Sequence, residues 1–183
     1  MIPNETLSLI AGFIAMSFVV IAYFVKKKVL YLVYQSACIV FLILSYLFNA
    51  QYFAMIGMVI GLWRALTFFW LEHKEKDASI LWSYLFSGLT IASYFIVNFW
   101  ILGDAKPLDI LCLFASCAYA FIFRIRNLKI VRFTMLAPTI VSILYNILSG
   151  AALFVTISYS FELGANVVSI FKYHVIKPHK DRT

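Results

Sequence analysis

Two charged residues of opposite sign lie inside long apolar runs of this 183-residue chain. Arg64 ends the stretch of residues 57–64, and Glu162 lies in the stretch of residues 158–166. An isolated charge within a bilayer costs about 2.5 to 3.5 kcal/mol on insertion scales. The two could form a structural ion pair, contact a polar solute in a shared cavity, or let Glu162 carry a proton. These alternatives remain open from the sequence.

Polar residues at helical spacing accompany these charges. Residues three or four apart share one face of a helix, and a polar face within a membrane turns toward protein or water. The sequence contains four such lines: Ser45 and Asn49; Gly57, Gly61 and Arg64; Pro138, Ser142, Asn146 and Ser149; Ser158, Glu162, Asn166 and Ser169. From them we select the following as candidate solute-binding residues: Arg64, Glu162, Asn166, Asn49 and Asn146.

Several of these residues also have a purely structural explanation. Gly57 and Gly61 form a small-xxx-small pair, which close packing of two helices would use. Asn49 and Asn146 lie near the ends of their apolar runs, where an amide can cap a turn. Pro138 can kink its helix, and a kink beside a solute path is also a means of gating.

Catalytic groupings are scarce. We find no Ser-His-Asp set, no His-x-x-x-His pair and no glycine-rich phosphate loop, and no apolar run contains two carboxylates. Cys38, Cys112 and Cys117 lie in apolar runs without CxxC spacing, as small buried hydrophobic residues do. We therefore expect no enzymatic activity, no metal and no cofactor.

The composition indicates the class of protein in which these two charges lie. Hydrophobic residues make up 64% and charged residues 13% of the chain, and the mean hydropathy is +0.94. Soluble domains are nearer half apolar and a quarter charged, so we interpret the chain as a multi-pass membrane protein. Although the net charge is +7, the basic residues form short clusters between apolar runs, so no nucleic-acid partner is expected.

We predict an all-α fold of seven transmembrane helices, since a span needs about 20 apolar residues. The first span has no basic segment before it, so we expect it to be retained, with the N-terminus outside. The predicted spans are residues 7–25, 29–48, 52–71, 80–102, 108–123, 130–148 and 151–171.

The distribution of positive charge agrees with this N-out, C-in topology. The four segments then expected in the cytoplasm, residues 26–28, 72–77, 124–132 and 172–183, hold 13 of the 15 lysines and arginines. Cytoplasmic loops carry such an excess. Trp70 and Trp82 would lie at the inner interface and Trp100 near the outer one.

An internal repeat is also indicated. The pattern S-x-L-aromatic-N occurs at residues 45–49 and again at residues 142–146, an offset of 97. This offset places spans one and two over spans five and six, and predicts two parallel three-helix repeats joined by a linker helix (3+1+3). The expected divisions are a first bundle (1–77), the linker (78–105), a second bundle (106–175) and a cytoplasmic tail (176–183).

These features resemble known membrane proteins. The parallel-triplet layout is similar to the SWEET, PQ-loop and PnuC-type superfamily of sugar and vitamin facilitators, and Asn166 resembles the pocket asparagine of such carriers. The Pro-Gln dipeptide that names PQ-loop proteins is missing, and of the prolines that SWEETs carry in their triplets only Pro138 remains.

The YgjV-like family of bacterial inner-membrane proteins is the nearer resemblance. Arg64 to Thr67 resembles its Arg-Thr-like element, Asn146 to Gly150 its Asn-x-x-x-Gly turn, and Glu162 with Asn166 the acid and asparagine of its last span. The resemblance implies a multi-pass protein of the bacterial inner membrane.

Two hypotheses about function follow. In the first, the chain is a facilitator in which two three-helix bundles rock about a midplane pocket that takes a small polar or zwitterionic solute. In the second, it is a non-transporting assembly or partner subunit, and the two charges only fix helix packing. The expected partners are the lipid bilayer and, in the first hypothesis, the solute; the sequence leaves a homo-oligomer open.

Overall fold

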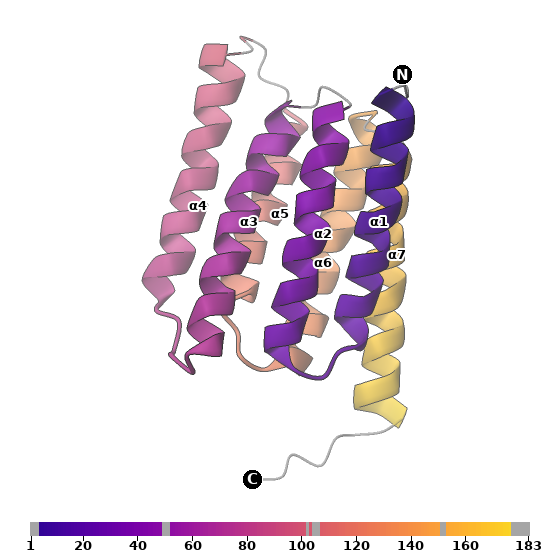
Figure 1. The fold of residues 1–183 in the computed structure, drawn as a ribbon. Coiled ribbons are helices and arrows are strands. Elements are labelled where there is room, and N and C mark those ends of the chain that lie inside the picture. Colours follow the sequence, from indigo (N-terminus) through magenta and orange to yellow (C-terminus); the bar gives the residue numbers. More distant parts are fainter. Residues whose placement is uncertain (1–3, 49–51, 102, 104–106, 151–152, 177–183) are drawn as a thin grey trace.

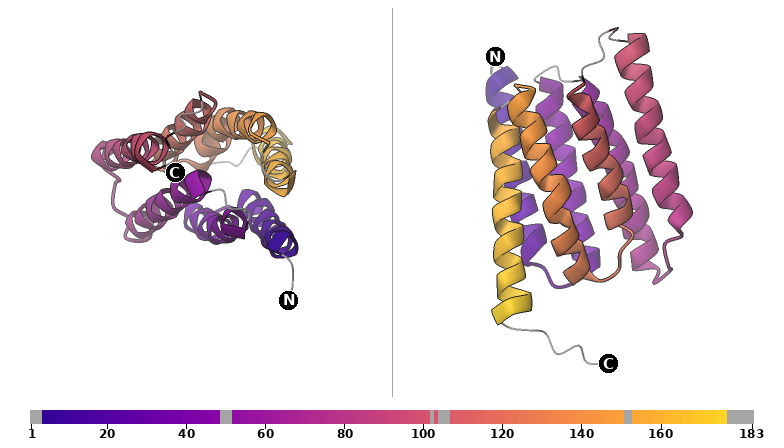
Figure 2. Two further views of the ribbon diagram at one scale, coloured as in Figure 1. Left: turned by 90° about the horizontal axis from the view of Figure 1, so that it is seen from above. Right: turned by 180° about the vertical axis from the view of Figure 1, so that it is seen from behind.

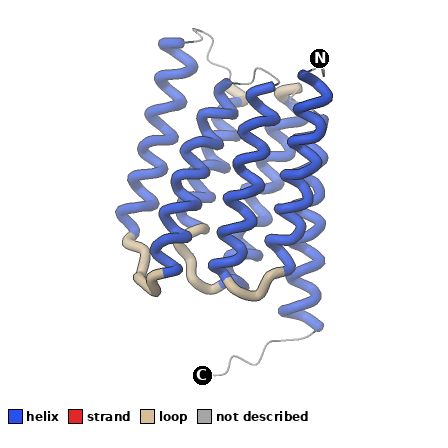
Figure 3. Tube along the Cα trace, viewed as in Figure 1, coloured by secondary structure: helices blue, strands red, loops and turns tan. Residues whose placement is uncertain are grey.

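The computed structural model describes residues 4–48, 52–101, 103, 107–150 and 153–176. Each of the seven predicted spans contains a helix (Figure 1), and the described residues contain no strand (Figure 3). The helices are α1 (Asn4–Phe24), α2 (Lys28–Phe48), α3 (Tyr52–His73), α4 (Ile80–Phe95), α5 (Asp109–Ile122), α6 (Leu128–Leu148) and α7 (Leu153–Ile170). Two π-helical segments, η1 (Ile96–Ile101) and η2 (Phe171–Ile176), follow α4 and α7.

Five segments are long and apolar enough to cross a membrane by length and composition. They are α1, α2, α3, α4 with most of η1, and α6. The other two helices are shorter: α5 has 14 residues and α7 has 18. The prediction of an all-helical membrane protein is therefore confirmed, and within the described residues five of the seven predicted spans meet the length and hydropathy expected of a span.

Local sequence signals set several helix ends. Ser79 and Asn127 precede α4 and α6, and their side-chain oxygens accept hydrogen bonds from the backbone amides of Leu81 and Lys129. These are N-caps, which satisfy amides that have no partner within the helix.

The end of α3 is closed by a Schellman motif. The Lys76 amide donates to the Leu71 carbonyl at 3.0 Å, and the Glu75 amide donates to the Glu72 carbonyl at 3.1 Å. Glu75 has a φ of 54°, in the left-handed position that glycine usually takes in this motif.

The helices form two rows that face each other (Figure 2). One row contains α1, α2 and α3 in sequence order, and the other contains α4, α5, α6 and α7. At one edge α1 packs against α7, and at the other α3 packs against α4 and α5. Successive helices run in opposite directions, so the loops of residues 25–27, 74–79 and 123–127 lie at one end of the bundle, here called the basic end (Figure 1).

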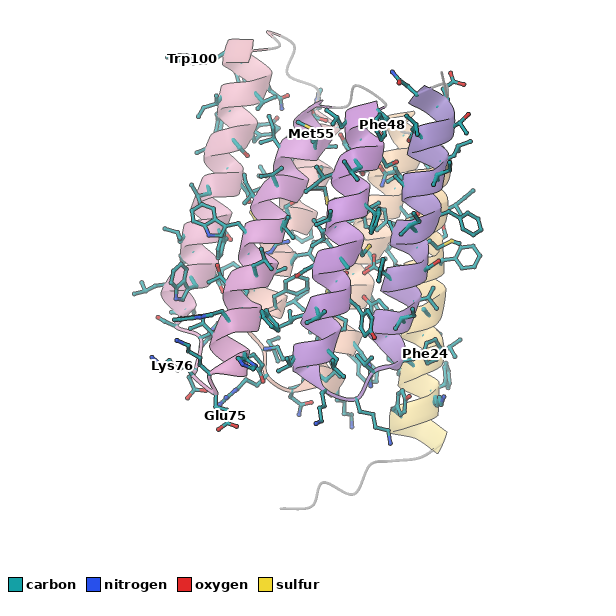
Figure 4. All side chains as sticks on the ribbon, in the orientation of Figure 1. Phe24, Phe48, Met55, Glu75, Lys76 and Trp100 are labelled. Carbon is teal, nitrogen blue, oxygen red and sulfur yellow. The ribbon has the colours of Figure 1, made fainter. Side chains whose placement is uncertain are left out.

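Polarity is arranged as expected for a protein surrounded by lipid. Large apolar side chains are exposed on all seven helices, as Figure 4 illustrates with Trp100, whose exposed fraction is 90%. The predicted polar lines turn inward, because Ser45, Ser142, Ser158, Asn166 and Ser169 are all buried. Ser149, at the end of its line, is exposed.

Candidate functional site

A cavity of about 70 Å³ lies between the two rows, bordered by α2, α3, α5, α6 and α7. Its wall is mostly apolar and aromatic, and the polar residues in it include Gln35, Arg64, Ser116, Tyr119 and Glu162. This volume admits a few water molecules. Both charges that the sequence singled out therefore border the same internal space.

Arg64 forms the α3 side of this cavity, and 5% of its surface is exposed. Its Nη1 donates to the carbonyl oxygen of Ser116 on α5 at 2.8 Å. The guanidinium carbon lies 5.3 Å from the ring centre of Phe123 and 5.9 Å from that of Tyr119, within the range of cation–π attraction. Among the described residues Nε has no hydrogen-bond partner, so part of the donor capacity of this buried cation is unused there.

Glu162 forms the α7 side, with 7% of its surface exposed. Its Oε1 accepts a hydrogen bond from the Tyr23 hydroxyl of α1 at 2.8 Å and another from Gln35 Nε2 of α2 at 3.5 Å. The Gln35 amide also donates to the Tyr31 hydroxyl at 3.2 Å. One carboxyl oxygen is thus held from two neighbouring helices of the other row.

No nitrogen of Arg64 lies within 4.0 Å of a Glu162 oxygen, because the ion pairs found among the described residues join other groups. Both charges are near the middle of their helices. At 1.5 Å per residue, Arg64 is about 18 Å from the start of α3 and Glu162 about 14 Å from the start of α7. The structure therefore gives each charge its own partners instead of a direct pair.

The glycines before Arg64 border the cavity. A methyl group added at Gly57 would meet no atom within 4 Å, and one at Gly61 would meet only Arg64 Nη2, at 3.5 Å. Both residues are part of the cavity wall. Close packing of α3 against another helix, the explanation favoured by the small-xxx-small pattern, is therefore not what these glycines serve.

The other predicted site residues that the structure describes, Asn146, Asn166 and Pro138, do not border this cavity. Asn166 is fully buried and its Nδ2 donates to the Arg132 carbonyl of α6 at 2.8 Å, which ties α7 to α6. Asn146 Nδ2 donates to the Ser142 carbonyl one turn earlier in its own helix. Pro138 is buried within α6, and Asn49 lies outside the described residues.

Several polar residues in or near the site were missed from the sequence, and three of them show why. Gln35 is an amide within an apolar span, and a search for such residues would have found it. Tyr23 carried no signal, because tyrosines occur throughout the chain. Arg132 was counted with the cytoplasmic loop of residues 124–132, but it lies in α6, is 3% exposed, and donates to the carbonyls of Tyr23 and Val25 at the end of α1.

A polar network crosses between the rows at the basic end. Glu72 Oε2 lies 3.0 Å from Lys28 Nζ and 3.8 Å from Arg126 Nε, and Arg126 Nη1 lies 2.9 Å from Asp77 Oδ1. Arg124 Nε also donates to the Ala78 carbonyl at 2.8 Å. These contacts join the α5–α6 loop to the ends of α2 and α3 and to the α3–α4 loop, and so connect the two rows at this end.

Comparison with known proteins gives one match. Residues 6–177 match the family model Imp-YgjV, described as bacterial inner membrane protein. A search of curated proteins and a search of solved structures each found no match. Because the matched residues include nearly the whole chain and several helices are apolar enough to span a bilayer, the protein belongs to the Imp-YgjV family and is a multi-pass protein of the bacterial inner membrane.

Proposed function

We propose that the protein is a facilitator-type transporter of a small polar solute, which binds in the cavity between Arg64 and Glu162. The solute would present an anionic or hydrogen-bond-accepting group to Arg64 and a cationic or donor group to Glu162. A zwitterion meets both requirements without leaving a net charge in the membrane interior.

The observation that carries this proposal is that two buried, oppositely charged side chains border one cavity without contacting each other. A buried charge that serves packing alone is expected to have a counter-charge or a full set of hydrogen bonds, because an uncompensated buried charge is costly. Here Arg64 faces aromatic rings and a carbonyl, and Glu162 faces a hydroxyl and an amide. A solute placed between them would supply the missing counter-charges.

An alternating-access mechanism between two three-helix bundles fits the arrangement of the rows. The proposed 3+1+3 repeat pairs α1–α3 with α5–α7, and its offset of 97 places Cys38 over Met135; both border the cavity. Parallel repeats of this kind resemble the SWEET and PQ-loop layout and place substrate sites at the repeat interface.

The network around Glu72 and Arg126 connects the two rows at the basic end. With the proposed N-out, C-in topology this end is cytoplasmic, since cytoplasmic loops are rich in Lys and Arg. Separation of the two rows at this network would open the cavity inward and enlarge it for the solute. Pro138 leaves α6 without one backbone donor. We propose that α6 bends at this residue when the two rows separate.

Thiol accessibility provides a direct test, because Cys112 borders the cavity and Cys117 does not. Two single-cysteine variants, each retaining one of these thiols, would be exposed to a small charged methanethiosulfonate reagent in vesicles of both orientations. Transport predicts that Cys112 reacts from at least one side, and faster than Cys117. If Cys112 reacts no faster than Cys117 from either side, the cavity is sealed and the alternative of a non-transporting partner subunit is favoured.

The solute can then be sought by thermal-shift screening of purified protein against small zwitterions and polar metabolites. A solute bound between the two charges should raise the melting temperature of the parent but not of Glu162→Gln or Arg64→Gln. Asp109→Asn is the matched control, because Asp109 is a buried carboxyl of α5 that does not border the cavity. Equal shifts in the parent and in both cavity variants would place the solute elsewhere.

A further inference from the structure

The two rows meet at one edge, where α1 lies beside α7 (Figure 2). An apolar groove lies between these two helices. Its volume is about 400 Å³, and it is bordered by Val20, Phe24, Ser160, Phe161, Gly164 and Ala165. The one hydroxyl among these residues donates to the Thr156 carbonyl of its own helix at 2.9 Å. The groove therefore offers hardly any polar surface to an occupant.

The groove is open toward the surroundings of the bundle. Gly164 is exposed, and a methyl group added there would meet no atom within 4 Å. Phe161 is 52% exposed and forms one wall. In a membrane protein this surface faces acyl chains, and a hollow lined by apolar atoms gains contact energy only when a chain fills it.

Three lysines lie close to Phe24, either in space or along the chain, where this groove reaches the basic end. Phe24 marks the position, at the lower end of α1 beside α7 (Figure 4). Lys172 Nζ lies 5.4 Å from the centre of the Phe24 ring. Lys26 and Lys27 follow Phe24 in the chain and are exposed. Within the described part of the chain, none of the three lysines has a carboxylate within 4.0 Å.

The spacing between the groove and these lysines matches one leaflet. Ser160 and Ala165 precede Lys172 by twelve and seven residues, which corresponds to about 18 and about 10 Å along a helix. Half of a typical hydrocarbon core is about 15 Å thick. An acyl chain in the groove would thus place its headgroup at the level of the lysines.

We propose that this surface binds an anionic phospholipid, with one acyl chain in the α1–α7 groove and the phosphate group at Lys172, Lys26 and Lys27. Basic residues at the membrane surface attract anionic headgroups, while the groove provides the shape that retains one lipid. The inference is independent of the proposed transport, because none of these residues borders the central cavity.

Native mass spectrometry of the full-length protein, titrated with phosphatidylglycerol or phosphatidylcholine, tests the proposal. The parent should retain phosphatidylglycerol preferentially. Removing the charge of Lys26 and Lys172 together (K26Q with K172Q) should weaken phosphatidylglycerol binding about 30-fold, or about fivefold for each lysine. Binding of phosphatidylcholine should hardly change.

Gly164→Leu fills the groove and should weaken binding of both lipids, because each uses an acyl chain. Gly88→Leu is its matched control: Gly88 is exposed on α4 and a methyl group there also meets no atom within 4 Å. Lys76→Gln is the control for charge, because Lys76 lies in the α3–α4 loop at the same end. Equal retention of both lipids by the parent would overturn the proposal. So would effects of the two controls as large as those of the groove and lysine variants.

Discussion

Replacing Tyr23 by phenylalanine removes the shortest hydrogen bond of the Glu162 carboxyl group. The bond is 2.8 Å long, both residues are buried, and the remaining bond from Gln35 is 3.5 Å long. Side-chain hydrogen bonds between membrane helices contribute about 0.6 kcal/mol on average and up to about 1.7. A charged acceptor roughly doubles the strength of such a bond. We therefore expect Tyr23→Phe to lower the free energy of unfolding by about 1.5 kcal/mol.

Equilibrium unfolding in mixed detergent and sodium dodecyl sulfate micelles measures this difference. Tyr46→Phe is the control, because Tyr46 is 2% exposed and its hydroxyl has no hydrogen-bond partner within the described part of the chain. It should change stability by less than about 0.5 kcal/mol. In a double-mutant cycle with Glu162→Gln, we expect a coupling of at least about 0.5 kcal/mol. A coupling near zero, or an equal loss in Tyr46→Phe, would refute the assignment of Tyr23 as the principal partner of Glu162.

Three further predictions concern stability and can be measured as changes in unfolding free energy or melting temperature. Glu75→Gly should raise the free energy of unfolding by about 1 kcal/mol, because glycine adopts the left-handed conformation without strain. A lower free energy of unfolding in this variant would contradict the Schellman assignment. Asn98→Leu should be neutral or stabilising, since neither amide atom of this buried residue has a partner among the described residues. Asn166→Leu should instead cost about 1 kcal/mol through the lost interhelical bond. Glu72→Gln should lower the free energy of unfolding by about 1 to 3 kcal/mol because it leaves the mostly buried Lys28 ammonium without its counter-charge. Asp77→Asn should have little effect, because the Asp77 side chain is 90% exposed.

The candidate site was identified from the sequence only in part. A charge in an apolar run has a thermodynamic cost that composition alone makes visible, so Arg64 and Glu162 could be selected without a structure. Their partners could not. Tyr23 lies 139 positions from Glu162 and Ser116 lies 52 from Arg64, and no local pattern links residues so far apart.

Polar and small residues at helical spacing can line a binding site or hold two helices together, and the sequence did not distinguish these two roles. Asn166 has the residue type and spacing of a binding residue, yet its amide holds α7 to α6. Gly57 and Gly61 have the pattern of a packing motif, yet they leave room beside the cavity. Helical periodicity specifies which residues share a face, but not which neighbour that face meets.

The sequence by itself determined that this is a multi-pass helical membrane protein, because apolar runs of span length leave a helix as the conformation that satisfies every backbone group in lipid. It also determined that the short basic clusters belong between spans, where water is available. The tertiary structure alone decided that α1 meets α7 and that Arg64 and Glu162 face one cavity as separate charges. The order and rotation of the helices set those distances, and they depend on the packing of all seven helices together.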